Sequence, residues 1–140
     1  MNIRPYIATQ KSEFFLIFCV AFLFRYLFSS FSGIDNFDGP DNYRYMVQSD
    51  EILNGNFNLE EKLFITAPLF PYLLAAFKGI FASQYILALE AFQISLSSLS
   101  AVYLMLTSKI IFNSKRVGLL SGILFSIYPI SLYYSHQFSQ

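Results

Sequence analysis

Apolar residues gather in long runs along this chain, and short polar segments separate the runs. The first run occupies residues 13–31 and carries one charged residue in its interior, Arg25. A helix needs about 20 residues to cross the hydrocarbon core of a bilayer, so this run predicts a membrane-spanning helix. Two later runs, residues 85–112 and 117–134, predict further spans. Pro129 lies inside the last run, where neighbouring helices would satisfy the carbonyl group that it frees.

The first run also has a second interpretation, a cleaved signal peptide. A signal peptide has a short apolar core, which is followed by small residues at the cleavage site. Here the apolar run is longer than such a core usually is, and Arg25 interrupts the place where the cleavage site should lie. We therefore expect an uncleaved helix with a cytoplasmic N-terminus.

A shorter apolar segment, residues 68–81, could cross the membrane or lie in its interface. The positive charges decide, because cytoplasmic loops carry an excess of Lys and Arg. Basic residues gather before the first run (Arg4 and Lys11) and around the break between the last two runs (Lys109, Lys115 and Arg116). Both groups are cytoplasmic only if residues 68–81 do not cross. We therefore expect three spans, with residues 32–84 and the tail after residue 134 outside the cytoplasm; the alternative is four spans.

The composition places the chain in the membrane class. Of its 140 residues, 55% are apolar and 13% are charged, whereas a soluble domain carries about 25% charged residues. The formal net charge is zero without a basic stripe, so nucleic acid is not an expected partner. Cys19 is the single cysteine, and no Cys/His cluster has zinc spacing. The expected fold is an all-α integral membrane protein that forms one membrane unit.

The polar segment after the first run is rich in turn signals. Ser-Gly, Asp-Asn and Asp-Gly-Pro all occur between residues 32 and 41. Residues 41–53 then predict a short amphipathic helix. One face of it is expected to carry Tyr45, Met46, Ser49 and Leu53. Asp38 can cap this helix, with Asp41 three residues later as in a capping box, and beside a membrane anchor the helix should lie in the interface plane.

Three motifs follow one another along the chain. The first is residues 40–45 (PDNYRY), followed by residues 52–57 (ILNGNF), and the second is residues 67–71 (APLFP). The third runs from Gly118 through Tyr128-Pro129-Ile130 to Tyr134-Ser135-His136. In this order the motifs resemble the N-terminal part of the C-type (GT-C) membrane glycosyltransferases, which include the protein O-mannosyltransferases and the aminoarabinose transferases that act on lipid A.

The resemblance implies transfer of a sugar from a polyprenyl-phosphate donor to an acceptor on the extracytoplasmic face of a cell membrane, of the bacterial inner-membrane type. It implies that Asp41 is the general base that deprotonates the acceptor hydroxyl. Asp38 would be a second catalytic carboxylate, which tunes Asp41 or binds a divalent metal. Arg44 would hold the donor phosphate, and Tyr45 and His136 would contact substrate. No cofactor other than such a metal is implied, and the remaining expected partner is membrane lipid.

The chain also departs from the family pattern. Thr66-Ala67 stands where the family often has a basic residue. After the last helix the family often has an Arg and then an acidic residue, whereas residues 136–140 contain neither. The family's catalytic module has several further helices, so we expect these 140 residues alone to be inactive, as an incomplete N-terminal portion or a truncated remnant of the enzyme.

The same residues also have structural interpretations. Asp38 and Asp41 could only cap a helix, and Arg44 could pair with Asp41 at the i, i+3 spacing. Arg25 is expected either to snorkel to the interface or to pair with the loop, and Lys78 to meet solvent or lipid headgroups. The alternative function is a small structural membrane subunit that binds a partner membrane protein through its aromatic helices.

Overall fold

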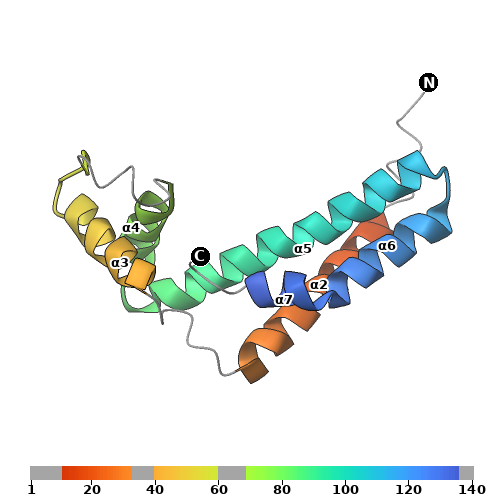
Figure 1. The fold of residues 1–140 in the computed structure, drawn as a ribbon, viewed down its shortest axis with the longest axis horizontal. Helices are drawn as coiled ribbons and strands as arrows, with labels where there is room; N and C mark the ends of the chain where they lie inside the picture. The colour runs from red at the N-terminus through yellow and green to blue at the C-terminus, as the bar shows by residue number, and fades with distance from the viewer. Residues whose placement is uncertain (1–10, 33–39, 60–68, 136–140) are drawn as a thin grey trace. The chain divides into compact units, whose positions relative to one another are not determined.

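The computed structural model describes residues 11–32, 40–59 and 69–135, in which the regular structure is entirely helical (Figure 1). The side chains of residues 32, 40 and 41 lie outside this description. The elements are α2 (Lys11–Ser32), α3 (Pro40–Leu53), α4 (Leu69–Phe81), the 3-10 helix η2 (Ala82–Gln84), α5 (Tyr85–Ile111), α6 (Lys115–Ile127) and α7 (Pro129–Tyr134). The expectation of an all-α fold is therefore confirmed for the described residues.

Two helical stretches are long and apolar enough to cross a membrane. They are Lys11–Phe31, within α2, and Leu69–Ile111, which runs from α4 to the end of α5. α4 has 13 residues, or about 20 Å at 1.5 Å per residue, which is shorter than a hydrocarbon core of about 30 Å. α5 has 27 residues and is long enough without α4. The structure thus supplies two candidate spans.

The chain packs into two compact units. Among the described residues, the first unit holds α2, the part of α5 from Gln93 onward, α6 and α7. The second unit holds α3, α4, η2 and the first two turns of α5, up to Phe92. Each unit has its own apolar core.

The core of the first unit is formed where α2, α5 and α6 meet. Its buried apolar side chains are Ile17, Ala21, Ala101, Val102 and Met105. Gly118 and Gly122 bring α6 close to this core, since a Cβ atom at Gly118 would lie 2.8 Å from Lys109 Cβ, and one at Gly122 would lie 3.2 Å from Ile17 Cγ2. Small residues allow such close helix approach, and interfaces between membrane helices are enriched in them.

α6 and α7 divide the last apolar run, which was predicted as one helix over residues 117–134. α6 ends at Ile127, and Tyr128 adopts an extended conformation with ψ of 118°. A residue before proline is disfavoured in the helical region, because the proline ring clashes with its backbone. Pro129 then occupies the start of α7, where its missing N–H group is not needed. The prediction of one uninterrupted helix is wrong for this physical reason.

The core of the second unit joins α3 to α4 and to the first turns of α5. Tyr45, Leu74 and Leu89 form one buried cluster, and Ile52, Leu59 and Ala75 form another. α3 begins at Pro40, one residue before the predicted start. Proline is common at the first position of a helix, since its φ is already suitable there.

The buried face of α3 differs from the predicted face at its C-terminal end. Of the residues predicted to share one face, Tyr45 and Ser49 are buried, but Leu53 is 49% exposed; Ile52 is buried instead. At 100° per residue, Ile52 lies about 20° from Tyr45 around the helix axis, whereas Leu53 lies about 80° away. The polar side chain of Gln48 is also buried.

Candidate functional site

The residues predicted to form the catalytic site are only partly placed. Asp38 and His136 lie outside the described residues. Asp41 lies in the first turn of α3, and its side chain is outside the description. Arg44 is exposed on the next turn of the same helix. Tyr45 is 6% exposed, and its ring packs edge-on against Phe70 with centroids 4.9 Å apart. α3 therefore carries three of the five predicted residues within its first two turns.

The described residues include only part of the predicted metal site. Among the His, Cys, Asp and Glu side chains of residues 11–31, 42–59 and 69–135, no three lie close enough together to hold a metal ion. Asp38 and the side chain of Asp41 are outside that set. The divalent metal therefore stays a prediction.

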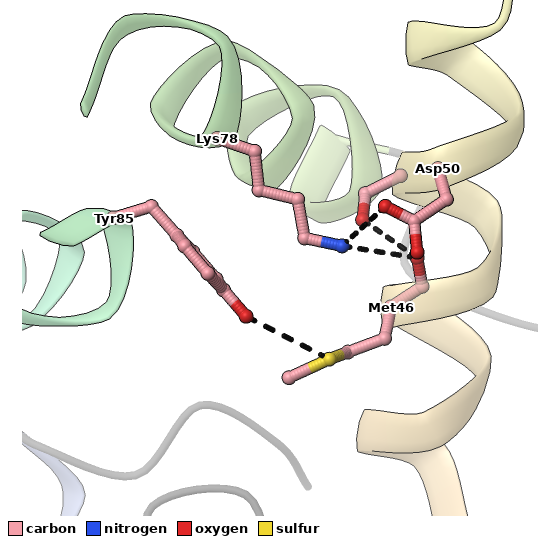
Figure 2. A network of polar contacts seen from close by, with 5 residues as sticks. Met46, Asp50, Lys78 and Tyr85 are labelled. Carbon is pink, nitrogen blue, oxygen red and sulfur yellow. Dashed lines mark hydrogen bonds and ion pairs between the residues drawn. The ribbon is translucent and has the colours of Figure 1, made fainter. Parts of the chain in front are cut away.

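Lys78 is the centre of a polar network in the second unit, which Figure 2 shows. Its Nζ atom donates to Asp50 Oδ1 at 2.6 Å and to the Met46 carbonyl at 3.4 Å. The Nζ atom also lies 5.6 Å from the centroid of the Tyr85 ring, and the Tyr85 hydroxyl donates to Met46 Sδ at 3.9 Å. The network joins α3, α4 and the first residue of α5.

The burial of Lys78 corrects the expectation of a solvated or headgroup-bound lysine. Its side chain is 12% exposed, whereas that of Asp50 is 60% exposed. A buried charge requires a partner, and the sequence shows that Lys78 is the single charged residue of α4. The sequence does not show the partner, because Asp50 is 28 residues away in a different helix.

Arg25 is the centre of a second polar cluster, in the first unit. Its side chain is fully buried. Nε donates to Ser97 Oγ at 2.8 Å, one terminal nitrogen donates to Ser131 Oγ at 2.8 Å, and the other donates to the Ala21 carbonyl at 3.1 Å. The guanidinium carbon also lies 5.6 Å from the centroid of the Phe125 ring. The cluster ties together α2, α5, α6 and α7.

Both expectations for Arg25 are wrong. The guanidinium group does not snorkel to the interface, because it is buried among helices. Its hydrogen-bond partners are two serines on α5 and α7 and a carbonyl of α2, rather than loop residues. A charged residue inside an apolar span signals that partners must exist. The serines themselves lie 72 and 106 residues away, and neither has a local signal.

A hollow of about 430 Å³ opens beside this cluster, within the first unit. Its lining consists of Gln93, Leu96, Ser97, Phe125, Tyr128, Ile130, Ser131, Tyr134 and Ser135. Gln93 Oε1 is buried and has no hydrogen-bond partner in the part of the chain that the structure describes. Sites for small molecules are typically apolar hollows with a few converging polar groups, and this hollow has that character.

Comparisons with family models, with curated proteins and with solved structures give no match to this chain.

Proposed function

We propose that this chain forms the N-terminal membrane part of a GT-C glycosyltransferase that takes its sugar from a polyprenyl-phosphate donor. The observation that supports this most is the start of α3. The helix begins at Pro40, so that Asp41, the general base that the motif implies, lies in the first turn. Two contacts hold α3 against α4. Tyr45 of α3 packs on the Phe70 ring of α4, and Asp50 of α3 pairs with Lys78 of α4.

In this proposal the chain crosses the membrane three times, with α2, α5 and the broken helix of α6 and α7. Glu13, near the start of α2, pairs with Lys109 in the last turn of α5 and with Lys115 at the start of α6. The N-terminal end of α2 therefore lies at the basic end of the first unit. The excess of positive charge makes this the cytoplasmic end, which gives a cytoplasmic N-terminus.

The reaction joins the acceptor oxygen to the anomeric carbon of the sugar and breaks the bond from that carbon to the phosphate oxygen. Asp41 takes the proton of the acceptor hydroxyl, and the lipid phosphate leaves with the electron pair of the broken bond. Arg44 stabilises the charge of the leaving phosphate. Asp38 supports Asp41 or holds a divalent metal, and His136 contacts substrate. Tyr45, which the motif also implies as a substrate contact, is buried against Phe70 and in this proposal holds the helix that carries Asp41.

The experiment compares Asp41→Asn with Asp50→Asn in the protein as it occurs in its own membrane. Transfer from a radiolabelled polyprenyl-phosphate sugar is measured and normalised to folded protein. Loss of a general base lowers rates by about 10²–10⁴-fold, so Asp41→Asn is expected to lose at least two orders of magnitude. Asp50→Asn makes the same chemical change on the same helix. It weakens the ion pair with Lys78 and so lowers stability, but because transfer is normalised to folded protein it should retain transfer. Equal transfer by both variants would reject the proposed base.

The second candidate is a structural membrane subunit, and the burial of Tyr45 favours it. Tyr45 fills the α3–α4 core, which is the position of a packing residue. In such a subunit Asp41→Asn would change only helix capping, at about 1 kcal/mol. The same assay separates the two functions, because a subunit has no transfer activity for the substitution to remove.

A further inference from the structure

Arg25 places a positive charge inside a candidate span, six residues before the end of that span at Phe31, and its neighbours are neutral groups. Its partners are two hydroxyls, one carbonyl and an aromatic ring. Among the described residues no carboxylate forms an ion pair with it. A buried charge is stabilised by an opposite charge, so the surroundings of Arg25 favour an anion.

The hydroxyls of Ser97 and Ser131 connect this charge to the hollow. Both serines line it, and both accept a hydrogen bond from the guanidinium group through Oγ. A serine hydroxyl that accepts one hydrogen bond still has a proton to donate. The hollow therefore offers two hydroxyl donors that are backed by a cation, an arrangement that suits the oxygen atoms of a phosphate.

The rest of the lining indicates what the phosphate is attached to. Leu96, Phe125 and Ile130 supply apolar wall, which suits a hydrocarbon chain. Gln93 Oε1, buried and unpartnered, requires a hydrogen-bond donor such as a hydroxyl group. Arg25 lies six residues, or about 9 Å at 1.5 Å per residue, before Phe31, where the candidate span of α2 ends, so the site lies near the level at which lipid headgroups begin.

We propose that this hollow binds a lipid phosphate whose head carries a hydroxyl group. The chain lies against the apolar wall, the phosphate accepts from Ser97 and Ser131 under the charge of Arg25, and the head hydroxyl donates to Gln93. Binding of this kind requires no sugar transfer. It can therefore be tested with no sugar donor present, and its failure would leave the proposed reaction at Asp41 untouched.

The test is native mass spectrometry of the full chain in detergent. Phosphatidylglycerol and diacylglycerol, which has a head hydroxyl but no phosphate, are added at equal concentrations with the same acyl chains. A hydrogen bond to a charged group contributes about 1.5–3 kcal/mol, which corresponds to at least a tenfold difference in affinity. We expect about tenfold more bound phosphatidylglycerol. Equal retention of the two lipids would overturn the proposal.

Three variants locate the site. Arg25→Met and Ser131→Ala should each remove most of the tenfold preference, and Ser131→Ala does so by deleting a single oxygen atom. Ser100→Ala is the control, because the exposed Ser100 hydroxyl bonds the Leu96 carbonyl of its own helix and does not line the hollow. Circular dichroism shows which variants fold. If the folded Ser131→Ala variant keeps the full preference for phosphatidylglycerol, the lipid does not bind at Ser131 and the proposed site is wrong.

Two further comparisons test the nature of the ligand. Gln93→Leu should abolish any preference for phosphatidylglycerol over phosphatidic acid, whose head carries no hydroxyl-bearing substituent. If the unaltered chain binds these two lipids equally, the role of the head hydroxyl is wrong. Inorganic phosphate at the same concentration as the lipid should not displace it, because free phosphate has no hydrocarbon chain to pack against the apolar wall. Displacement would show a site for free phosphate and overturn the lipid assignment.

Discussion

Lys109, in the last turn of α5, donates a hydrogen bond to Glu13 Oε2 at 3.4 Å, across 96 residues of sequence. Both side chains are largely buried, with 8% and 14% exposed. Lys115, at the start of α6, pairs with the other oxygen of the same carboxylate. One acidic residue thus fixes the ends of three helices, and α5 must run opposite to α2 and α6 within the first unit.

The first prediction concerns this carboxylate. Glu13→Gln should lower the free energy of unfolding by about 1–3 kcal/mol, because the buried Lys109 ammonium group loses its ion pair with Glu13. Unfolding in mixed micelles with increasing SDS measures the change. Lys11→Gln is the control, since Lys11 is exposed. If Glu13→Gln and Lys11→Gln unfold at the same SDS fraction, the ion pairs of Glu13 do not stabilise the packing of α5 against α2.

The second prediction concerns the contact of α6 with α5. In Gly118→Ala the new methyl group would meet Lys109 Cβ at 2.8 Å and the Met105 carbonyl oxygen at 2.9 Å. Overpacking of this kind costs about 1–3 kcal/mol, which exceeds the gain of about 1 kcal/mol in helix propensity. We expect net destabilisation in the SDS titration.

Gly79→Ala is the matched control for the same substitution in a helix. A Cβ atom there would meet only Leu53 Cδ2, at 3.6 Å, which is ordinary contact. Gly79→Ala should therefore be neutral or stabilising by up to about 1 kcal/mol. If both alanine variants behave alike, α6 does not approach α5 as closely as the structure has it.

Features that depend on neighbouring residues could be predicted from the sequence, whereas contacts between residues far apart in the chain could not. The first span and α3 were predicted because apolar length and helical spacing are local properties. The break at Tyr128 was missed because proline was judged tolerable inside a membrane helix, although its effect on the preceding residue is equally general. For the candidate site, Asp41 and Arg44 could be named from a motif. Ser97 and Ser131 could not, since only the packing of α5 and α7 brings them to Arg25.

The third prediction separates the two roles of Arg25, packing and charge. Arg25→Met keeps most of the volume and removes a buried charge that no carboxylate of the described residues offsets. The lost hydrogen bonds are then balanced against the relieved cost of burying the charge, so this variant should be close to neutral for stability. Arg25→Ala leaves a cavity and should cost about 2–5 kcal/mol, as other large-to-small core substitutions do. SDS titration of both variants tests this. A Met variant as unstable as the Ala variant would mean that the hydrogen bonds to Ser97 and Ser131 dominate the stability of the first unit.

The last prediction uses the unequal burial of Lys78 and Asp50. Removal of the exposed partner leaves a buried ammonium group without its carboxylate, whereas removal of the buried partner leaves a carboxylate that water can solvate. Asp50→Asn should therefore cost about 1–3 kcal/mol, and Lys78→Met, which retains the apolar stem of the side chain, should cost less than about 1 kcal/mol. The order of the two unfolding midpoints in SDS is the measurement. The reverse order would mean that Met46 and Tyr85, which also contact the Lys78 ammonium group, stabilise its charge without the help of Asp50.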